Sequence, residues 1–339
     1  MHLNNGFAVR LGALALLVAV TTGCGVSVPR QESKWTALLE EVRAFERRMG
    51  FSKTGNFLDL SKEEEAISIC GRASRFYLPY SYQDPAIQWR ESVTEEECRK
   101  GSEGSDIYYS KVEAWGEVGT PVTPAMLDGK LDRFFYLVIH EDCHDQFDLP
   151  YGVEEALCNV IAYKAMPVFS RERYGANSRE HKAVSEYASR QEALTRGTNA
   201  SYEQLEKLYG RYGRKEVSAE QLLRERAALF RKAEKALAWR RGALNNVSLA
   251  NDMTYSRHYP LIESAYNALG RDLERTVALF RRGRDQALAA GGHEAAPPHR
   301  RKKRGTDPGL RSRSGEDHRA GAGGSDEEKV RRKTVGGRR

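Results

Sequence analysis

Beyond its first 24 residues, the chain has no run of the roughly 20 apolar residues that a membrane-spanning helix needs. It also shows no internal repeat. Its apolar content is ordinary, and 30% of its residues are charged. With 339 residues, the composition indicates a globular protein of one large domain or two small ones.

The fold itself also lacks a net basic charge. The formal charge of the chain is +7, but residues 292–339 contain 14 Lys and Arg against 7 Asp and Glu. The rest of the chain is therefore close to neutral, which argues against a basic nucleic-acid-binding face and against a specific nucleic-acid partner. The tail has almost no large apolar residue, so we expect residues 292–339 to be disordered and, in the simplest interpretation, without a specific partner. Binding of its basic clusters to anionic lipid, surface polymer or nucleic acid is the alternative.

The N-terminal segment has the layout of an export signal. Arg10 precedes an apolar run, residues 11–20, that is too short to span a bilayer. The end of this segment, Val-Thr-Thr-Gly-Cys at residues 20–24, resembles a bacterial lipobox. That resemblance implies cleavage before Cys24, a lipid anchor on this cysteine and a location in the cell envelope. An ordinary secretion signal is the alternative, and either interpretation predicts an exported protein.

Cysteine is scarce, and the four residues other than Cys24 are Cys70, Cys98, Cys143 and Cys158. An even number in an oxidising compartment permits disulfides. Three pairings are possible, and order along the chain favours Cys70–Cys98 with Cys143–Cys158. Reduced, buried cysteines remain the alternative.

Periodicity predicts an α+β fold that is predominantly helical. We expect an amphipathic helix over residues 34–49 and a strand over 107–115. A helix buried on nearly all sides begins at 131, and a second apolar helix covers about 153–166. Two further helical regions are expected, a set of long solvated helices that can pair as a hairpin over 202–244, and a final helix over about 259–282.

The motif His140-Glu141-Asp142-Cys143-His144 lies in the first of the buried helices. Residues four apart lie on one helix face, so both imidazoles can bind a single Zn²⁺, with Glu141 close enough to reach a metal-bound water. Burying two histidines and a carboxylate in an apolar helix is costly unless they have a purpose. The motif therefore predicts a catalytic zinc site.

A third ligand is available just downstream, where Glu154 and Glu155 follow a short break. The sequence pattern alone does not decide which of the two glutamates is the third ligand. Asn159 lies four residues after Glu155, on the same helix face, and we expect it to hydrogen-bond a ligand histidine.

The segment Glu154-Glu155-Ala-Leu-Cys-Asn159 is similar to the Asn-Glu-x-x-x-Asp element of thermolysin-like peptidases, the gluzincins. It departs from that element by having Glu for Asn and Asn for Asp. The resemblance nominates Glu155 as the third ligand in preference to Glu154. It implies a zincin-like, gluzincin-type domain, with a small sheet beside two ligand-bearing helices.

A second resemblance covers about residues 40–282. The chain resembles a bacterial family of HExxH-bearing zinc aminopeptidases in the segments VRAFERRMGF (42–51), GTPVTPAML (119–127), FYLVIHEDCHDQ (135–146), EEALCNVIAY (154–163) and LNNVSLANDMTYSRHYPLIESAYNALGRDLERTVALF (244–280). The family resemblance implies a zinc peptidase acting on peptide or protein substrates, and again maps the third ligand to Glu155. We expect one metallopeptidase domain over 25–291, as a monomer.

Three ligands leave one zinc position for water, whose pKa falls toward about 7 so that Glu141 can act as the general base. Tyr255, His258 and Tyr259 are candidates for a second oxyanion donor because they lie in the last segment of the resemblance. Tyr255 and Tyr259 can equally be core aromatics. The strand over 107–115 can serve as an edge for an extended peptide or lie inside the sheet.

The remaining polar residues near the motif have simpler interpretations. Asp142 and Asp145 are expected to cap the helix or face solvent, and His181 to lie at the surface. Cys143 points away from His144 and is better explained by a disulfide or by packing than as a ligand.

Two other functions remain open. The chain can be a non-catalytic envelope lipoprotein that binds cell-wall material or a partner protein, or it can hydrolyse an amide in peptidoglycan. Glu141 favours an enzyme over a structural zinc site, because a structural site is normally closed by four protein ligands and needs no base.

Overall fold

A computed structural model describes residues 26–28, 32–61, 67–112, 119–237, 239 and 241–289. The chain divides into two units, residues 1–294 and 295–339, and all described residues belong to the first. The predicted signal segment, the lipidation site at Cys24 and the tail from 292 lie outside the described residues and stay predictions.

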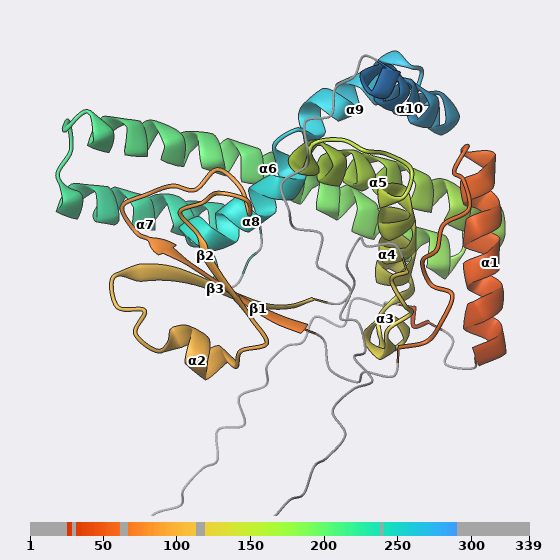
Figure 1. Ribbon diagram of the computed structural model, residues 1–339, viewed down its shortest axis with the longest axis horizontal. Coiled ribbons are helices and arrows are strands. Elements are labelled where there is room, and N and C mark those ends of the chain that lie inside the picture. Colours follow the sequence, from red (N-terminus) through yellow and green to blue (C-terminus); the bar gives the residue numbers. More distant parts are fainter. Residues whose placement is uncertain are drawn as a thin grey trace, which may run out of the picture. The chain divides into compact units, whose positions relative to one another are not determined.

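The described residues form a mainly helical domain with one small sheet (Figure 1), which confirms the expected α+β, predominantly helical class. In chain order the elements are α1 Glu32–Arg48, β1 Ile67–Ser74, β2 Gln88–Glu91, α2 Glu95–Arg99, β3 Ser105–Val112, α3 Pro124–Asp128, α4 Leu131–His144, α5 Tyr151–Tyr174, α6 Arg179–Gly213, α7 Ala219–Ala236, α8 Asn246–Ser256, α9 Tyr259–Ala268 and α10 Leu273–Ala289. Within the described ranges, no helix combines the length and the apolar character needed to cross a membrane.

The sheet is antiparallel throughout, with the strand order β2-β1-β3. Gly71 in β1 is required by close packing, because a Cβ there would lie 2.6 Å from the Trp89 ring and 2.9 Å from Val247 of α8. Val247 and Ala250 pack against residues of the sheet region, so α8 covers one sheet face. The predicted strand over 107–115 corresponds to β3, an edge strand of this sheet, whose described part ends at Val112.

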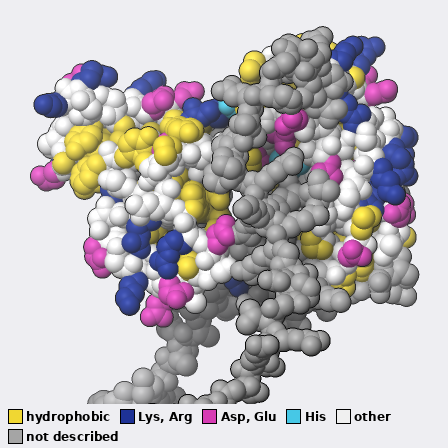
Figure 2. All heavy atoms as spheres, in the orientation of Figure 1, with side chains coloured by type: hydrophobic (Ala, Val, Ile, Leu, Met, Phe, Trp, Pro, Cys, Tyr) yellow, Lys and Arg dark blue, Asp and Glu magenta, His cyan; other side chains and the backbone are white. Residues whose placement is uncertain are grey.

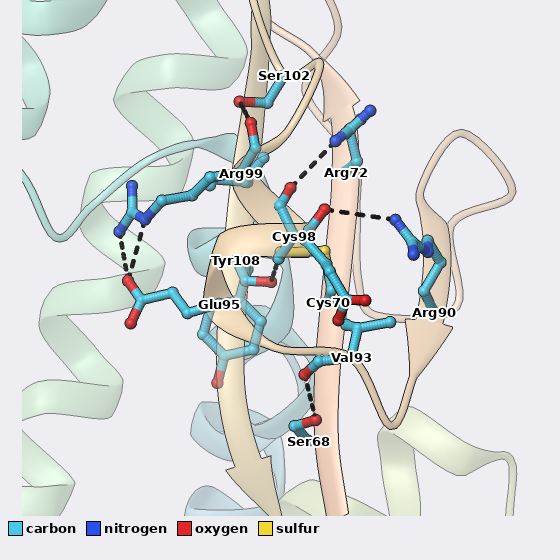
Figure 3. The surroundings of a disulfide bond; sticks show 12 residues. Ser68, Cys70, Arg72, Arg90, Val93, Glu95, Cys98, Arg99, Ser102 and Tyr108 are labelled. Atoms are coloured by element: carbon cyan, nitrogen blue, oxygen red, sulfur yellow. Dashed lines mark hydrogen bonds and ion pairs between the residues drawn. A yellow bond between two sulfur atoms is a disulfide. The ribbon is translucent and has the colours of Figure 1, made fainter.

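One disulfide, Cys70–Cys98, joins β1 to the short helix α2 (Figure 3). Arg72, two residues further along β1, donates hydrogen bonds to the carbonyls of Cys98, Lys100 and Gly101. A basic side chain at these last carbonyls stabilises the end of a helix. The pairing expected from chain order is confirmed here, and Cys143–Cys158 is formed as well.

The main core lies around α4. Twelve of the fourteen residues of α4 are buried, which confirms a helix enclosed on nearly all sides. The predicted amphipathic helix is α1, and it adds its apolar face to this core through Trp35, Leu38, Leu39, Val42 and Phe45.

Two predicted helix limits are wrong. Helix α5 continues past Met166 to Tyr174 through Pro167, since burial of its neighbours Met166 and Phe169 offsets the cost of about 3 kcal/mol of an internal proline. The long helical region begins at Arg179 rather than at 202, and α6 and α7 then pack against each other, as a hairpin would.

The predicted final helix is in fact two helices, α9 and α10. Gly270 and Arg271 between them have φ of 78° and 62°, which lies outside the right-handed helical region. Helix α8 had no prediction of its own. Asn245 caps its N-terminus, with a side chain that accepts hydrogen bonds from the backbone N–H groups of Val247 and Ser248.

Candidate metal centre

Two helices that pack against each other, α4 and α5, carry the candidate ligands. His140 and His144 lie one turn apart in the last part of α4. Pro150 precedes α5, and its φ of −53° suits the start of a helix. Glu155 lies in the second turn of α5. Figure 2 shows histidine and acidic side chains close together near the middle of the face that it presents.

The ligand atoms of these three residues form a nearly equilateral triangle. His140 Nε2 lies 3.3 Å from His144 Nε2 and 3.1 Å from Glu155 Oε2, and His144 Nε2 lies 3.5 Å from the same carboxylate oxygen. Ligands about 2.0–2.1 Å from a tetrahedral zinc lie about 3.3 Å from one another. The two imidazoles and the carboxylate, which the sequence analysis assigned as ligands, therefore fit a zinc ion in both spacing and chemistry.

The charged groups of this cluster shift one another's pKa values. Burial alone would raise the pKa of Glu155, but the charge of His144 and the hydrogen bonds from both histidines outweigh it and hold that pKa far below its usual range. Burial also opposes a charge on His144, yet Glu155 and Glu154 raise the pKa of this imidazole well above its ordinary value. The carboxylates thus create a potential that favours positive charge at the triangle.

Glu141 is buried beside the triangle. Its atom Oε2 has no hydrogen-bond partner within the part of the chain that the structure describes. Burial raises the pKa of Glu141, although the charges of His140 and His144 act in the opposite direction. A carboxylate with a raised pKa and an unused oxygen can accept a proton near neutral pH.

Glu154 is placed behind His144 and not at the triangle. Its Oε1 lies 2.9 Å from His144 Nδ1, and its Oε2 accepts a hydrogen bond of 3.0 Å from the backbone N–H of Leu149. A carboxylate on the outer nitrogen of an imidazole fixes the tautomer in which Nε2 carries the free lone pair. The geometry therefore gives Glu154 an orienting position, which its place in the sequence did not reveal.

The hydrogen bond expected between Asn159 and a ligand histidine is not formed. Its Oδ1 accepts a hydrogen bond of 2.8 Å from the hydroxyl of Tyr136, and the Tyr136 ring lies 5.0 Å from the His140 ring. Asn159 therefore supports His140 through an intervening aromatic ring and does not contact the imidazole as predicted.

The three candidates for the second oxyanion donor lie in different surroundings. The ring of Tyr255 lies 6.3 Å from that of His140, and the carboxylate of Glu155 raises the pKa of Tyr255 well above its usual value. Tyr259, in contrast, is fully buried in the main core. His258 is half-buried beside Gly152 at the start of α5.

Sequence reasoning missed Tyr151. Its side chain is 39% exposed, but its hydroxyl is hydrogen-bonded to Glu155, and burial of that hydroxyl together with the Glu155 charge raises its pKa. The available signal was the spacing, because Tyr151 lies four residues before Glu155 and so on the same helix face.

The expectations for the other polar residues were partly wrong. Asp142 is buried and accepts hydrogen bonds from Thr54 and Asn56, and Asn56 also donates to the carbonyl of Glu141. This network holds the backbone of α4 next to the triangle. His181 is half-buried and contacts the hydroxyl of Ser170, so it is not a free surface residue.

Comparison with known proteins gives one family-level result. A family model described as "Putative aminopeptidase" matches residues 89–288, more than half of the chain and all of α4, α5 and α8. No curated protein and no solved structure matches the chain.

Proposed function

Because the chain belongs to the putative aminopeptidase family, we propose that it is a zinc-dependent peptidase with a zincin-like, gluzincin-type active site. His140, His144 and Glu155 hold the metal in this proposal. Glu141 is the general base. The family description supports a peptidase acting on the N-terminal end of its substrate.

The observation that carries the proposal is the triangle of ligand atoms, with sides of 3.1, 3.3 and 3.5 Å. Three protein ligands with a free fourth position are typical of catalytic zinc. The buried base beside them supports catalysis over a purely structural role, since a structural site has no use for Glu141.

Zinc, when bound, supplies a Lewis acid that polarises the scissile carbonyl and acidifies water. With the metal bound, Glu141 would accept the proton of the attacking water and could return it to the leaving amine. Tyr255 faces the ligand cluster and is proposed as the second donor to the oxyanion. Glu154 and Tyr151 hold His144 and Glu155 in their orientations.

The two disulfides support an exported protein, because such bonds persist in oxidising compartments. We propose that the enzyme acts in the cell envelope on peptide or protein substrates, anchored by a lipid at Cys24.

The zinc content of the purified protein tests the proposal, measured beside the variants His140→Ala and Glu155→Ala. His181→Ala is the matched control, since His181 lies outside the triangle. About one zinc ion per chain in the wild type and the control, and little in the two ligand variants, is expected for this site. A screen of peptides with a free N-terminus then follows, with Glu141→Gln as the inactive reference.

A folded, zinc-supplied wild-type chain that contains no zinc would contradict the proposal. The non-catalytic envelope lipoprotein would then be the better interpretation of the family match. A chain that binds zinc but hydrolyses no peptide would retain the proposed zinc site and contradict the proposed peptidase activity.

A further inference from the structure

The second disulfide, Cys143–Cys158, joins the two helices that carry the candidate ligands. Cys143 lies three residues after His140 and directly before His144, and Cys158 lies three residues after Glu155. Three residues of helix span about 4.5 Å. The covalent bond therefore lies within one turn of a ligand on both helices.

We propose that the Cys143–Cys158 disulfide positions the metal ligands, by fixing α4 against α5 so that the triangle keeps the size required for high metal affinity. This inference rests on the proposed zinc site, and it assigns a role in that site to two residues that do not contact the metal.

The two helices must be held in a fixed register because metal coordination tolerates only small changes in ligand distance. Ligand distances in zinc sites vary by only about 0.2 Å, whereas a slide of one helix along its axis by the rise of one residue moves its side chains by about 1.5 Å. Since His140 and Glu155 come from different helices, any such movement opens the triangle.

Other contacts between the helices are non-covalent. The buried hydrogen bond from Tyr136 to Asn159 lies four residues before His140 on α4, and the disulfide lies three residues after it. The two links thus flank His140 along α4. A single hydrogen bond contributes only about 1 kcal/mol to stability, so the covalent link is the stronger restraint.

Burial protects this disulfide from reduction. Both cysteines are 0% exposed and belong to the main core. At its Cα–Cα separation of 5.5 Å, the two backbones approach closely. A reducing agent could reach the bond only after the core had opened.

The Cys70–Cys98 disulfide provides an internal control. It joins β1 to α2, and the residues labelled around it in Figure 3 belong to the sheet region and α2 and to neither ligand helix. It links residues 28 apart in sequence, compared with 15 for Cys143–Cys158. A longer closed loop gives a larger loss of entropy in the unfolded chain, so its removal should lower stability at least as much.

The test is the zinc dissociation constant of the full chain, measured by competition with a chromophoric chelator. The wild type is compared with Cys143→Ala/Cys158→Ala and with Cys70→Ala/Cys98→Ala. We expect affinity to fall about 10–100-fold in the first variant, the loss typical of a missing supporting contact around a metal ligand, and to stay within about threefold of wild type in the second. Circular dichroism and thermal unfolding of both variants report folding separately.

Two results would overturn the inference while leaving the proposed function intact. One is unchanged zinc affinity in folded Cys143→Ala/Cys158→Ala, and the other is an equal loss in both disulfide variants. Should the alanine pair fail to fold, Cys143→Val/Cys158→Ala fills more of the apolar volume and gives the same comparison. Failure of both pairs to fold would make the bond an element of global stability and so overturn the inference. A wild type that binds no zinc removes the proposed function itself.

Discussion

Glu154 contacts the outer nitrogen of His144, with 2.9 Å between Oε1 and Nδ1. Glu155, the next residue, has its carboxylate at the inner nitrogens of both histidines. Two adjacent glutamates on α5 thus act on opposite sides of one imidazole.

Substitution Glu154→Ala should weaken zinc binding without removing a ligand. We expect a loss of about 10–100-fold in affinity, because His144 loses the carboxylate that fixes its tautomer and ring orientation. Chelator competition measures this, with Asp148→Ala as the control, because Asp148 is an exposed acidic residue in the segment that connects α4 to α5. Unchanged affinity would mean that the packing around His144 orients it without help.

Substitution Glu141→Gln should separate metal binding from catalysis. Zinc content should stay at the wild-type level, whereas kcat/KM for a peptide substrate should fall by about 10²–10⁴-fold, the usual contribution of a general base. Both quantities are measured on the same preparation. Activity close to wild type would exclude Glu141 as the base, and loss of zinc would give it a structural role.

Tyr255 and Tyr259 offer a matched pair on consecutive helices. Tyr255→Phe should lower kcat by about 10²–10³-fold, as expected for the loss of one oxyanion donor, with zinc content unchanged. Tyr259→Phe removes a hydroxyl within the buried core and should leave kcat within about twofold of wild type. Equal effects of the two substitutions on kcat would show that Tyr255 is only part of the packing.

Asp252 on α8 should make stability depend on pH. Burial raises its pKa to about 7, and a hydrogen bond to Asn251 only partly opposes this. Since the folded pKa lies above the unfolded value of about 3.9, the protonated acid stabilises the fold at low pH, and this contribution is lost as the pH rises through 7.

Urea unfolding at pH 5 and pH 8 tests this expectation. The free energy of unfolding of the wild type should decrease over this interval by about 1–4 kcal/mol more than that of Asp252→Asn. Asp59→Asn changes an exposed carboxyl and should follow the wild type. Parallel pH profiles of wild type and Asp252→Asn would show that Asp252 titrates at its ordinary value.

Local regularity alone predicted much of the candidate site. The spacing of four residues puts His140 and His144 on one helix face whatever surrounds the helix, and the structure brings their Nε2 atoms together. The continuous apolar composition of residues 134–139 likewise predicted a buried helix, because such a segment has no polar side to expose.

Only the tertiary structure decided which partner each side chain meets. Which of Glu154 and Glu155 faces the histidines depends on how α5 rotates against α4, and that rotation follows from packing between residues distant in sequence. The placement of Tyr151 at Glu155 and of Tyr259 in the core has the same origin. Sequence periodicity fixes the face of a helix, whereas the burial of whole helices fixes what that face contacts.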